Sequence, residues 1–273
     1  MKRINLILAN LIILGIMTGC SGSGSSSKNT SENATDETKT IAEVHGITIT
    51  LNTKDKVKFS LGGSNAATID WGDGSPVETV KQLTEATDKF EHIYAQPAEY
   101  TIKITGENIT SLTCVSQNVT NLDLNVPTLT YLDVRCNELT TLDVSRNQAL
   151  ISLDCCSNNL TTLDLSKNQA LGDLYCGGNS LTTVDISKNT ALRYLNCDRG
   201  QLTSLDASNN IALGCLICND NQLSAEALNA LFRTLNSNDI VGGKMIVWVG
   251  NPGENTCDRS IAEKKGWQWW DND

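Results

Sequence analysis

Leucine recurs every 21 residues over the second half of the chain. One row with this period consists of Leu139, Leu160, Leu181, Leu202 and Leu223. A second row consists of Leu132, Leu153, Leu174, Leu195 and Leu216. A strict period of this length predicts one structural unit that is repeated along an axis. A single unit cannot bury its own leucines, so the units must stack and share a continuous core.

Cysteine and asparagine occupy fixed places in the same unit. The cysteine row consists of Cys155, Cys176, Cys197 and Cys218. The asparagine row is interrupted at Gly200 and consists of Asn137, Asn158, Asn179 and Asn221. We expect the thiols to pack as small buried hydrophobes. We expect the asparagines to turn inward and hydrogen-bond the backbone of adjacent turns, with a gap in this ladder at Gly200.

Each unit is close to L-x-x-L-x-C-x-x-N-x-L, which resembles the strand signature of the leucine-rich repeat. An upstream unit follows the same pattern, one residue out of the strict period, at Ile109, Leu112, Cys114, Gln117 and Val119. The resemblance implies a leucine-rich-repeat solenoid over residues 107–223. It also implies that the strands line the concave face of that solenoid.

The segment before the repeats has a different pattern. Apolar and polar residues alternate in "ITITLN", "KVKFSL" and "YTIKIT", which predicts strands. Between these strands stand landmarks that resemble those of a PKD-like β-sandwich: Trp71, Gly72, Asp73, Gly74, His92, Tyr94 and Tyr100. We therefore expect a small sandwich over residues 41–106. We expect His92 to have a core or turn role, because no nucleophile motif accompanies it.

The segment after the repeats is predicted to close the solenoid as a cap over residues 224–273. "LSAEALNALFRTLN" predicts an amphipathic helix with Ser224 as its N-cap. A buried strand and a short helix that stops at Gly266 follow it. Trp267, Trp269 and Trp270 could stack sugar rings, but we expect them to cap the solenoid.

Taken together, these patterns predict a mainly β protein with short helices. A leucine-rich-repeat solenoid is preceded by a small PKD/Ig-like β-sandwich and closed by a C-terminal α/β cap.

The N-terminus has the pattern of an export signal. Lys2 and Arg3 precede an apolar run, and "MTGC" ends at Cys20. This resembles the bacterial lipobox, which implies a lipoprotein signal peptide over residues 1–19 and lipidation of Cys20. A transmembrane helix is disfavoured because the apolar run is short. The polar stretch 20–40 is predicted to be a disordered tether. We expect an exported protein, lipid-anchored to the cell envelope at the outer membrane or cell surface.

Charge and composition exclude several functions. A net charge of −10 without a basic cluster disfavours nucleic acid as a partner. We find no motif for a catalytic acid–base pair, nucleophile, metal or phosphate site, so we expect no enzyme activity, cofactor or metal.

A row of aspartates and a set of cysteines outside the cysteine row each allow two interpretations. The aspartate row could suggest calcium and consists of Asp143, Asp164, Asp185 and Asp206. We expect it instead to serve local turns, with Arg146, Lys167 and Lys188 as counter-charges. Whether a disulfide forms among Cys136, Cys156, Cys215 and Cys257 is left open.

Strand alternation predicts which side chains face solvent. Three of the chain's five tyrosines fall in the outward rows, beside aspartates. The predicted ligand-binding residues are Tyr131, Asp133, Asp154, Asp173, Tyr175, Tyr194, Asn196 and Asp198. The whole pattern resembles internalin-like surface lipoproteins, which implies adhesion or recognition of a protein ligand by a monomer. Glycan capture for polysaccharide uptake is the alternative, and a structural spacer is a third hypothesis.

Overall fold

We describe a computed structural model of the 273-residue chain, over residues 45–53, 55–85 and 87–269. The predicted signal peptide, Cys20, the tether and Trp270 lie outside these residues. Within them, no helix has the length and apolar character that a membrane crossing requires.

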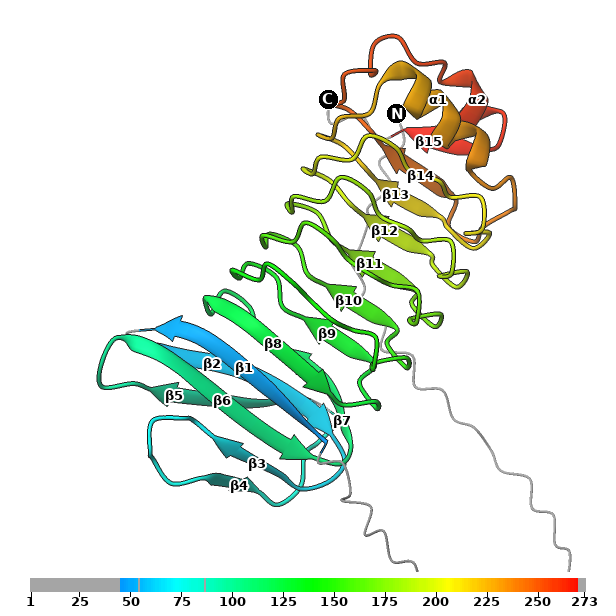
Figure 1. The fold of residues 1–273 in the computed structure, drawn as a ribbon. Helices are drawn as coiled ribbons and strands as arrows, with labels where there is room; N and C mark the ends of the chain where they lie inside the picture. Colours follow the sequence, from blue (N-terminus) through cyan, green and yellow to red (C-terminus); the bar gives the residue numbers. More distant parts are fainter. Residues whose placement is uncertain (1–44, 54, 86, 270–273) are drawn as a thin grey trace, which may run out of the picture. The chain divides into compact units, whose positions relative to one another are not determined.

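Two sheets account for the first part of the described chain (Figure 1). One has the order β4-β3-β6-β1-β8 and is antiparallel throughout. Its strands are β1 Gly46–Thr53, β3 Ala67–Asp70, β4 Glu78–Val80, β6 Ala98–Gly106 and β8 Val119–Asn125. The other sheet begins here with β2 Lys56–Gly63, β5 Asp88–Ile93 and β7 Ile109–Thr113.

The turn around Gly72 and Gly74 holds His92 in place. Both glycines have a positive φ, and a Cβ on Gly72 would lie 2.3 Å from the Thr101 carbonyl oxygen. His92 Nε2 lies 2.7 Å from Asp73 Oδ2, and its ring stacks on Trp71 at 4.8 Å. Hydrogen bonds from Ser75 and His92 lower the pKa of Asp73. His92 lies in β5, and these contacts to the turn support its predicted core or turn role.

The repeats form a solenoid whose short strands pair in parallel (Figure 1). Each of five successive strands contributes three residues, and equivalent leucines 21 residues apart are register partners. These strands are β9 Tyr131–Asp133, β10 Ser152–Asp154, β11 Asp173–Tyr175, β12 Tyr194–Asn196 and β13 Cys215–Ile217. The predicted fold class is confirmed: the chain is mainly β, with a leucine-rich-repeat-like solenoid.

Strand β7 joins this solenoid to the first part of the chain. It pairs in parallel with β9 and antiparallel with β2, so one sheet of ten strands runs from β5 to β15. Strand β8 pairs with β1 of the other sheet. The predicted upstream repeat therefore contributes strands to both sheets. The predicted division at residues 106 and 107 stays a prediction.

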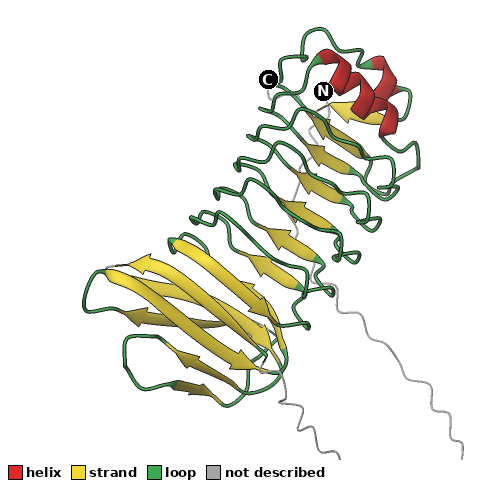
Figure 2. Cartoon of the chain, in the orientation of Figure 1, coloured by secondary structure: helices red, strands yellow, loops and turns green. Residues whose placement is uncertain are grey.

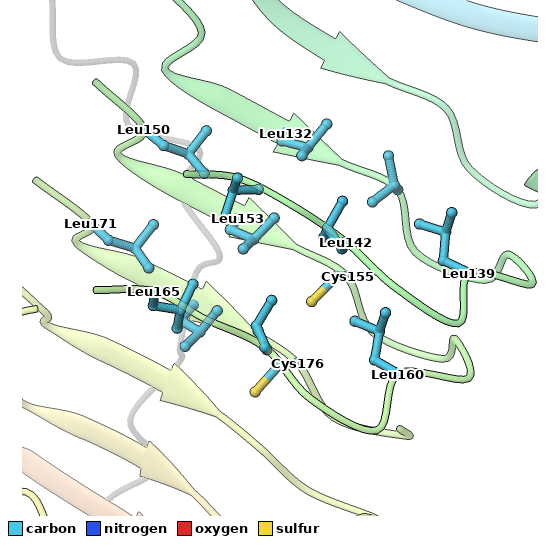
Figure 3. Close-up of a cluster of buried hydrophobic side chains, with 14 of the residues drawn as sticks. Leu132, Leu139, Leu142, Leu150, Leu153, Cys155, Leu160, Leu165, Leu171 and Cys176 are labelled. Carbon is cyan, nitrogen blue, oxygen red and sulfur yellow. The ribbon is translucent and has the colours of Figure 1, made fainter. Parts of the chain in front are cut away.

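The core of the solenoid consists of the periodic leucines and cysteines. Figure 3 shows leucines of successive turns lying one above another, with Cys155 and Cys176 among them. Both thiols and the leucines of the two rows are buried. A buried leucine contributes about 1.5–3 kcal/mol before the cost of ordering is subtracted. The predicted packing role of the cysteine row is confirmed.

The asparagine ladder has the predicted contacts. Asn158 Nδ2 donates to the carbonyl oxygens of Val134 at 3.0 Å and Cys155 at 3.1 Å. Its Oδ1 accepts the N–H of Leu139 at 3.0 Å. Because position 200 has no side-chain amide, the N–H of Leu181 lacks this kind of acceptor, and a void too narrow for water lies there.

A second asparagine ladder, which was not predicted from the sequence, stabilises the return side of the solenoid. Asn168 Nδ2 donates to the carbonyl oxygens of Val144 at 3.0 Å and Asn147 at 2.9 Å. The same contacts recur one turn later at Asn189. Nearby, the predicted local role of the aspartate row is confirmed, because Asp164 Oδ1 accepts the N–H of Ser166 at 2.9 Å.

Both described helices lie in the C-terminal part of the chain (Figure 2). Helix α1 spans Ala225–Thr234, and Ser224 accepts the N–H of Ala227 as the predicted N-cap. Strand β14 spans Lys244–Val247, α2 spans Ser260–Glu263 and β15 spans Trp267–Trp269.

The tryptophans of this segment pack on its core. Trp267 is buried, and its Nε1–H donates to the carbonyl oxygen of Asn236 at 2.9 Å. Trp269 lies 4.3 Å from Trp248, centroid to centroid. This packing supports the capping role and leaves Trp267 without an exposed ring for sugar stacking.

Candidate binding face

The parallel register brings the predicted residues onto one face of the sheet. Along one outward row, Tyr131 pairs with Ser152, Ser152 with Asp173, and Asp173 with Tyr194. The neighbouring outward row follows the same register and consists of Asp133, Asp154, Tyr175, Asn196 and Ile217. Paired residues point to the same side of a sheet. We call this surface of β9–β13, with the residues that directly follow each strand, the strand face.

The predicted solvent exposure was wrong for two of its aspartates. Asp133 is only 3% exposed and Asp198 only 9%. Asp133 Oδ1 accepts the backbone N–H of Arg135 at 3.3 Å, and the Arg135 guanidinium lies over the carboxylate. Asp198 folds down over Gly177, where a Cβ would lie within 1.9 Å of its Oδ1. Alternation gave the correct side of the sheet, but neighbouring residues cover these carboxylates.

The surroundings of Asp133 disfavour its negative charge. Burial, followed by repulsion from Asp154, raises the pKa of Asp133. Arg135 opposes this effect, with its Nη2 3.5 Å from Asp133 and its Nη1 3.2 Å from Asp154. One guanidinium therefore bridges carboxylates of two successive turns.

Two further arginines, which were not among the predicted ligand-binding residues, neutralise carboxylates of the strand face. Arg193 Nη2 lies 3.4 Å from Asp173 Oδ2, and Arg199 Nε lies 3.0 Å from Asp198 Oδ2. The sequence held one clue to the pair of Arg193 with Asp173: Gly172 has no side chain, which leaves room for the Arg193 guanidinium. Four aspartates therefore face three arginines, counting Arg135, and the face is nearly neutral.

The tyrosines provide the apolar part of the face. Tyr175 and Tyr194 pack at 4.7 Å between ring centroids, tilted by 31°. Tyr131 is 39% exposed. Burial, followed by the charge of Asp173, raises the pKa of Tyr175 to about 12. Burial also raises the pKa of Tyr194. The hydroxyls therefore stay neutral near pH 7 and can both donate and accept hydrogen bonds.

The thiols of the face are unsuited to nucleophilic chemistry. All nine cysteines in the described part of the chain are free, which includes Cys136, Cys156, Cys215 and Cys257. Burial, followed by the charge of Asp154, raises the pKa of Cys156 to about 12. Burial raises that of Cys215 to about 11. Within the described residues, histidine, cysteine and acidic side chains do not gather in a group of three that could hold a metal.

The fold and its strand face define a leucine-rich-repeat-like solenoid module. No protein-family model matches the chain, and a comparison with curated proteins gives no match. Among solved structures, it is similar to the functional domain of InlJ from Listeria monocytogenes, which includes a cysteine ladder. The identity is 35% and the TM-score 0.47, over 57% of this chain and 33% of that one.

Two other solved structures show a similar degree of likeness. One is the internalin InlF from Listeria monocytogenes, with 22% identity and a TM-score of 0.47, over 55% of this chain and 43% of that one. The other is a leucine-rich-repeat protein of Leptospira interrogans, with 19% identity and a TM-score of 0.43, over 54% and 38%. This chain thus spans less than half the length of each of these three proteins.

Proposed function

We propose that this chain is a non-enzymatic, membrane-anchored surface protein that binds a protein ligand through the strand face. The observation that supports this most is the gathering of Tyr131, Tyr175 and Tyr194 from separate turns onto one sheet surface. Tyrosine offers a large contact area and loses little rotamer entropy on binding, which is why it is enriched at recognition surfaces.

The polar part of the strand face supports a protein rather than a polyanion as the ligand. Ion pairs such as Arg135 with Asp154 contribute little to stability while they are exposed to solvent. Across an interface, such charges select complementary partners and fix the register of binding. Because carboxylates and guanidiniums are nearly balanced, the face has no strong field for a nucleic acid.

Glycan capture is a weaker alternative on the described residues. The predicted sugar platforms included the tryptophans near the C-terminus. Trp267 is buried, and Trp269 packs against Trp248 and Phe232. The tyrosine pair on the strand face would remain as a platform. It lies between charged groups that suit a protein surface equally well.

Membrane anchoring is proposed from the sequence. The pattern "MTGC" at Cys20 follows a cationic and apolar start, and the polar residues 20–40 would separate the anchor from the folded part. This arrangement would present the strand face at the cell envelope. The domain division is part of the same proposal, with a sandwich at 41–106, repeats at 107–223 and a cap at 224–273.

The test removes the tyrosines together. A pulldown with the wild-type protein first identifies a surface-protein ligand. A triple variant, Tyr131→Ala, Tyr175→Ala and Tyr194→Ala, should then bind this ligand at least ~30-fold more weakly, because a single central aromatic anchor commonly contributes ~2 kcal/mol or more. Its circular dichroism spectrum should stay that of the wild type.

The control for this test changes lysines away from the strand face. Lys167→Ala with Lys188→Ala removes two exposed charges from the return side of the solenoid and should leave binding nearly unchanged. If this control abolishes binding while the tyrosine variant keeps full affinity, the binding surface has been placed on the wrong side.

A further inference from the structure

The outward surface of the ten-stranded sheet does not end at the first repeat. Strand β7 places Ser111 beside Tyr131 and Thr113 beside Asp133. Strand β2 places Ser60 beside Thr113. Register partners share one side of a sheet, so the strand face continues across β7 and β2 onto β5.

A hollow lies on this continuation, and two lysines are among its lining residues. It has a volume of about 490 Å³, and its lining includes Lys58, Lys89, Glu91, Thr113, Val115 and Gln117. Gln117 Oε1 accepts the backbone N–H of Lys58 at 2.8 Å, which fixes one wall. We call this site the lysine hollow.

The lysines of the hollow have an unbalanced charge. Lys56 Nζ lies 2.8 Å from Glu91 Oε1 and neutralises it. Lys58 and Lys89 are exposed, and neither forms an ion pair in the described part of the chain. Lys56 lies outside the lining of the hollow and cancels the charge of Glu91, so Lys58 and Lys89 leave two positive charges there, in a chain whose net charge is −10.

The continuous surface therefore changes in character along its length. The solenoid end has tyrosines with paired aspartates and arginines, whereas the end at β2 and β5 has two lysines without an ion pair beside a hollow that Phe59 and Phe90 also line. Four strand steps separate β2 from β11. At about 4.8 Å per step the distance is roughly 19 Å, which an extended chain of about six residues spans.

We infer that the lysine hollow is a second subsite of the binding surface and takes an acidic segment of a protein ligand whose other part contacts the tyrosines. This inference rests on the proposed function. Charge complementarity carries it: unpaired ammonium groups over a hollow attract carboxylates, and Glu91 is already neutralised by Lys56.

The experiment uses a defined probe, an octaglutamate peptide with a fluorescein label. The full chain in neutral detergent is titrated at low ionic strength and the anisotropy is measured. The variant Lys58→Glu with Lys89→Glu should raise the dissociation constant at least tenfold, and added salt should weaken wild-type binding. The matched control, Lys81→Glu with Lys103→Glu, reverses two exposed charges associated with the other sheet and should change the constant less than twofold. Circular dichroism checks that each variant is folded.

Two results would overturn the inference. One is a dissociation constant for octaglutamate that is the same in the wild type and in the Lys58→Glu, Lys89→Glu variant. A control variant whose dissociation constant rises as much as that of this variant would count equally against it. The other is binding of a heparin-derived hexasaccharide through these lysines without binding of octaglutamate, which would make the ligand a glycan.

The triple tyrosine variant separates this inference from the proposed function. It should bind octaglutamate like the wild type, because the tyrosines are not part of the lysine hollow. Loss of the protein ligand by this variant, without any lysine-dependent binding of octaglutamate, would refute the subsite and leave the proposed function standing.

Discussion

Replacing Asn158 tests how much the asparagine ladder stabilises the solenoid. Its side chain accepts one N–H and donates to the carbonyl oxygens of Val134 and Cys155, with a third, longer contact to that of Cys156 at 3.3 Å. Each carbonyl keeps another donor: Asn137 donates to Val134, Asn179 to Cys155, and the N–H of Cys136 to Cys156. Asn158→Ala therefore leaves one completely buried group without any partner, the N–H of Leu139.

The expected cost follows from these contacts. An orphaned buried N–H costs about 1–3 kcal/mol, and the two lost donor contacts add about 0.5 kcal/mol each. The free energy of unfolding should fall by about 2–4 kcal/mol, which corresponds to a drop in Tm of roughly 5–15 °C for a chain of this size. Urea and thermal unfolding, followed by circular dichroism, measure both quantities.

Two further variants make this test sharper. Asn159→Ala removes an exposed neighbouring amide and should change stability by less than about 0.5 kcal/mol. Asn158→Asp retains the acceptor for Leu139 but turns a carboxylate toward the carbonyl oxygens of Val134 and Cys155. It should be less stable than Asn158→Ala at pH 7, since a buried charge without a partner is costly. If Asn158→Ala is as stable as Asn159→Ala, or if Asn158→Asp is as stable as the wild type, the role of this amide as both hydrogen-bond donor and acceptor is refuted.

Two other predictions concern Asp133 and Cys20. The raised pKa of Asp133 means that the native state holds its proton more tightly than the unfolded state, so its charge lowers stability at neutral pH and this cost disappears as the pH falls. Asp133→Asn should therefore have a higher Tm than the wild type at pH 7, with a difference that closes in acid; a lower Tm at pH 7 would show that the ion pair with Arg135 dominates. Cys20→Ser should leave the precursor unlipidated and move it out of the detergent phase, and partitioning like that of the wild type would disprove the lipobox interpretation.

The sequence predicted the solenoid well because its core obeys a strict period. A leucine, cysteine or asparagine that recurs every 21 residues has the same neighbours in each turn, so one correct placement extends to all. The second ladder had the same signal, since Asn147, Asn168, Asn189 and Asn210 share that period. It was missed because asparagine beside serine and lysine is equally typical of an exposed turn.

Exposure on the strand face was harder to predict because it depends on residues that break the period. Alternation assigns the side of a strand but not what covers a side chain there. Asp198 is covered because position 177 is glycine, and Asp133 because position 135 is arginine. The charge pairs of Arg193 and Arg199 likewise occur in single turns. The residues that distinguish one turn of this face from the next are therefore the ones that a repeat pattern describes least.

The junction between the N-terminal antiparallel strands and the solenoid shows why the first repeat departs from the period. Leu112 pairs with Leu132, a spacing of 20 residues, while later leucines pair at 21. Strand β7 pairs with β2 along one edge and with β9 along the other, while β8 pairs with β1. The first repeat therefore follows the register of β2, and its offset marks where one sheet passes from antiparallel to parallel pairing. This transition closes the N-terminal end of the solenoid core and makes a surface shared by tyrosines and lysines geometrically possible.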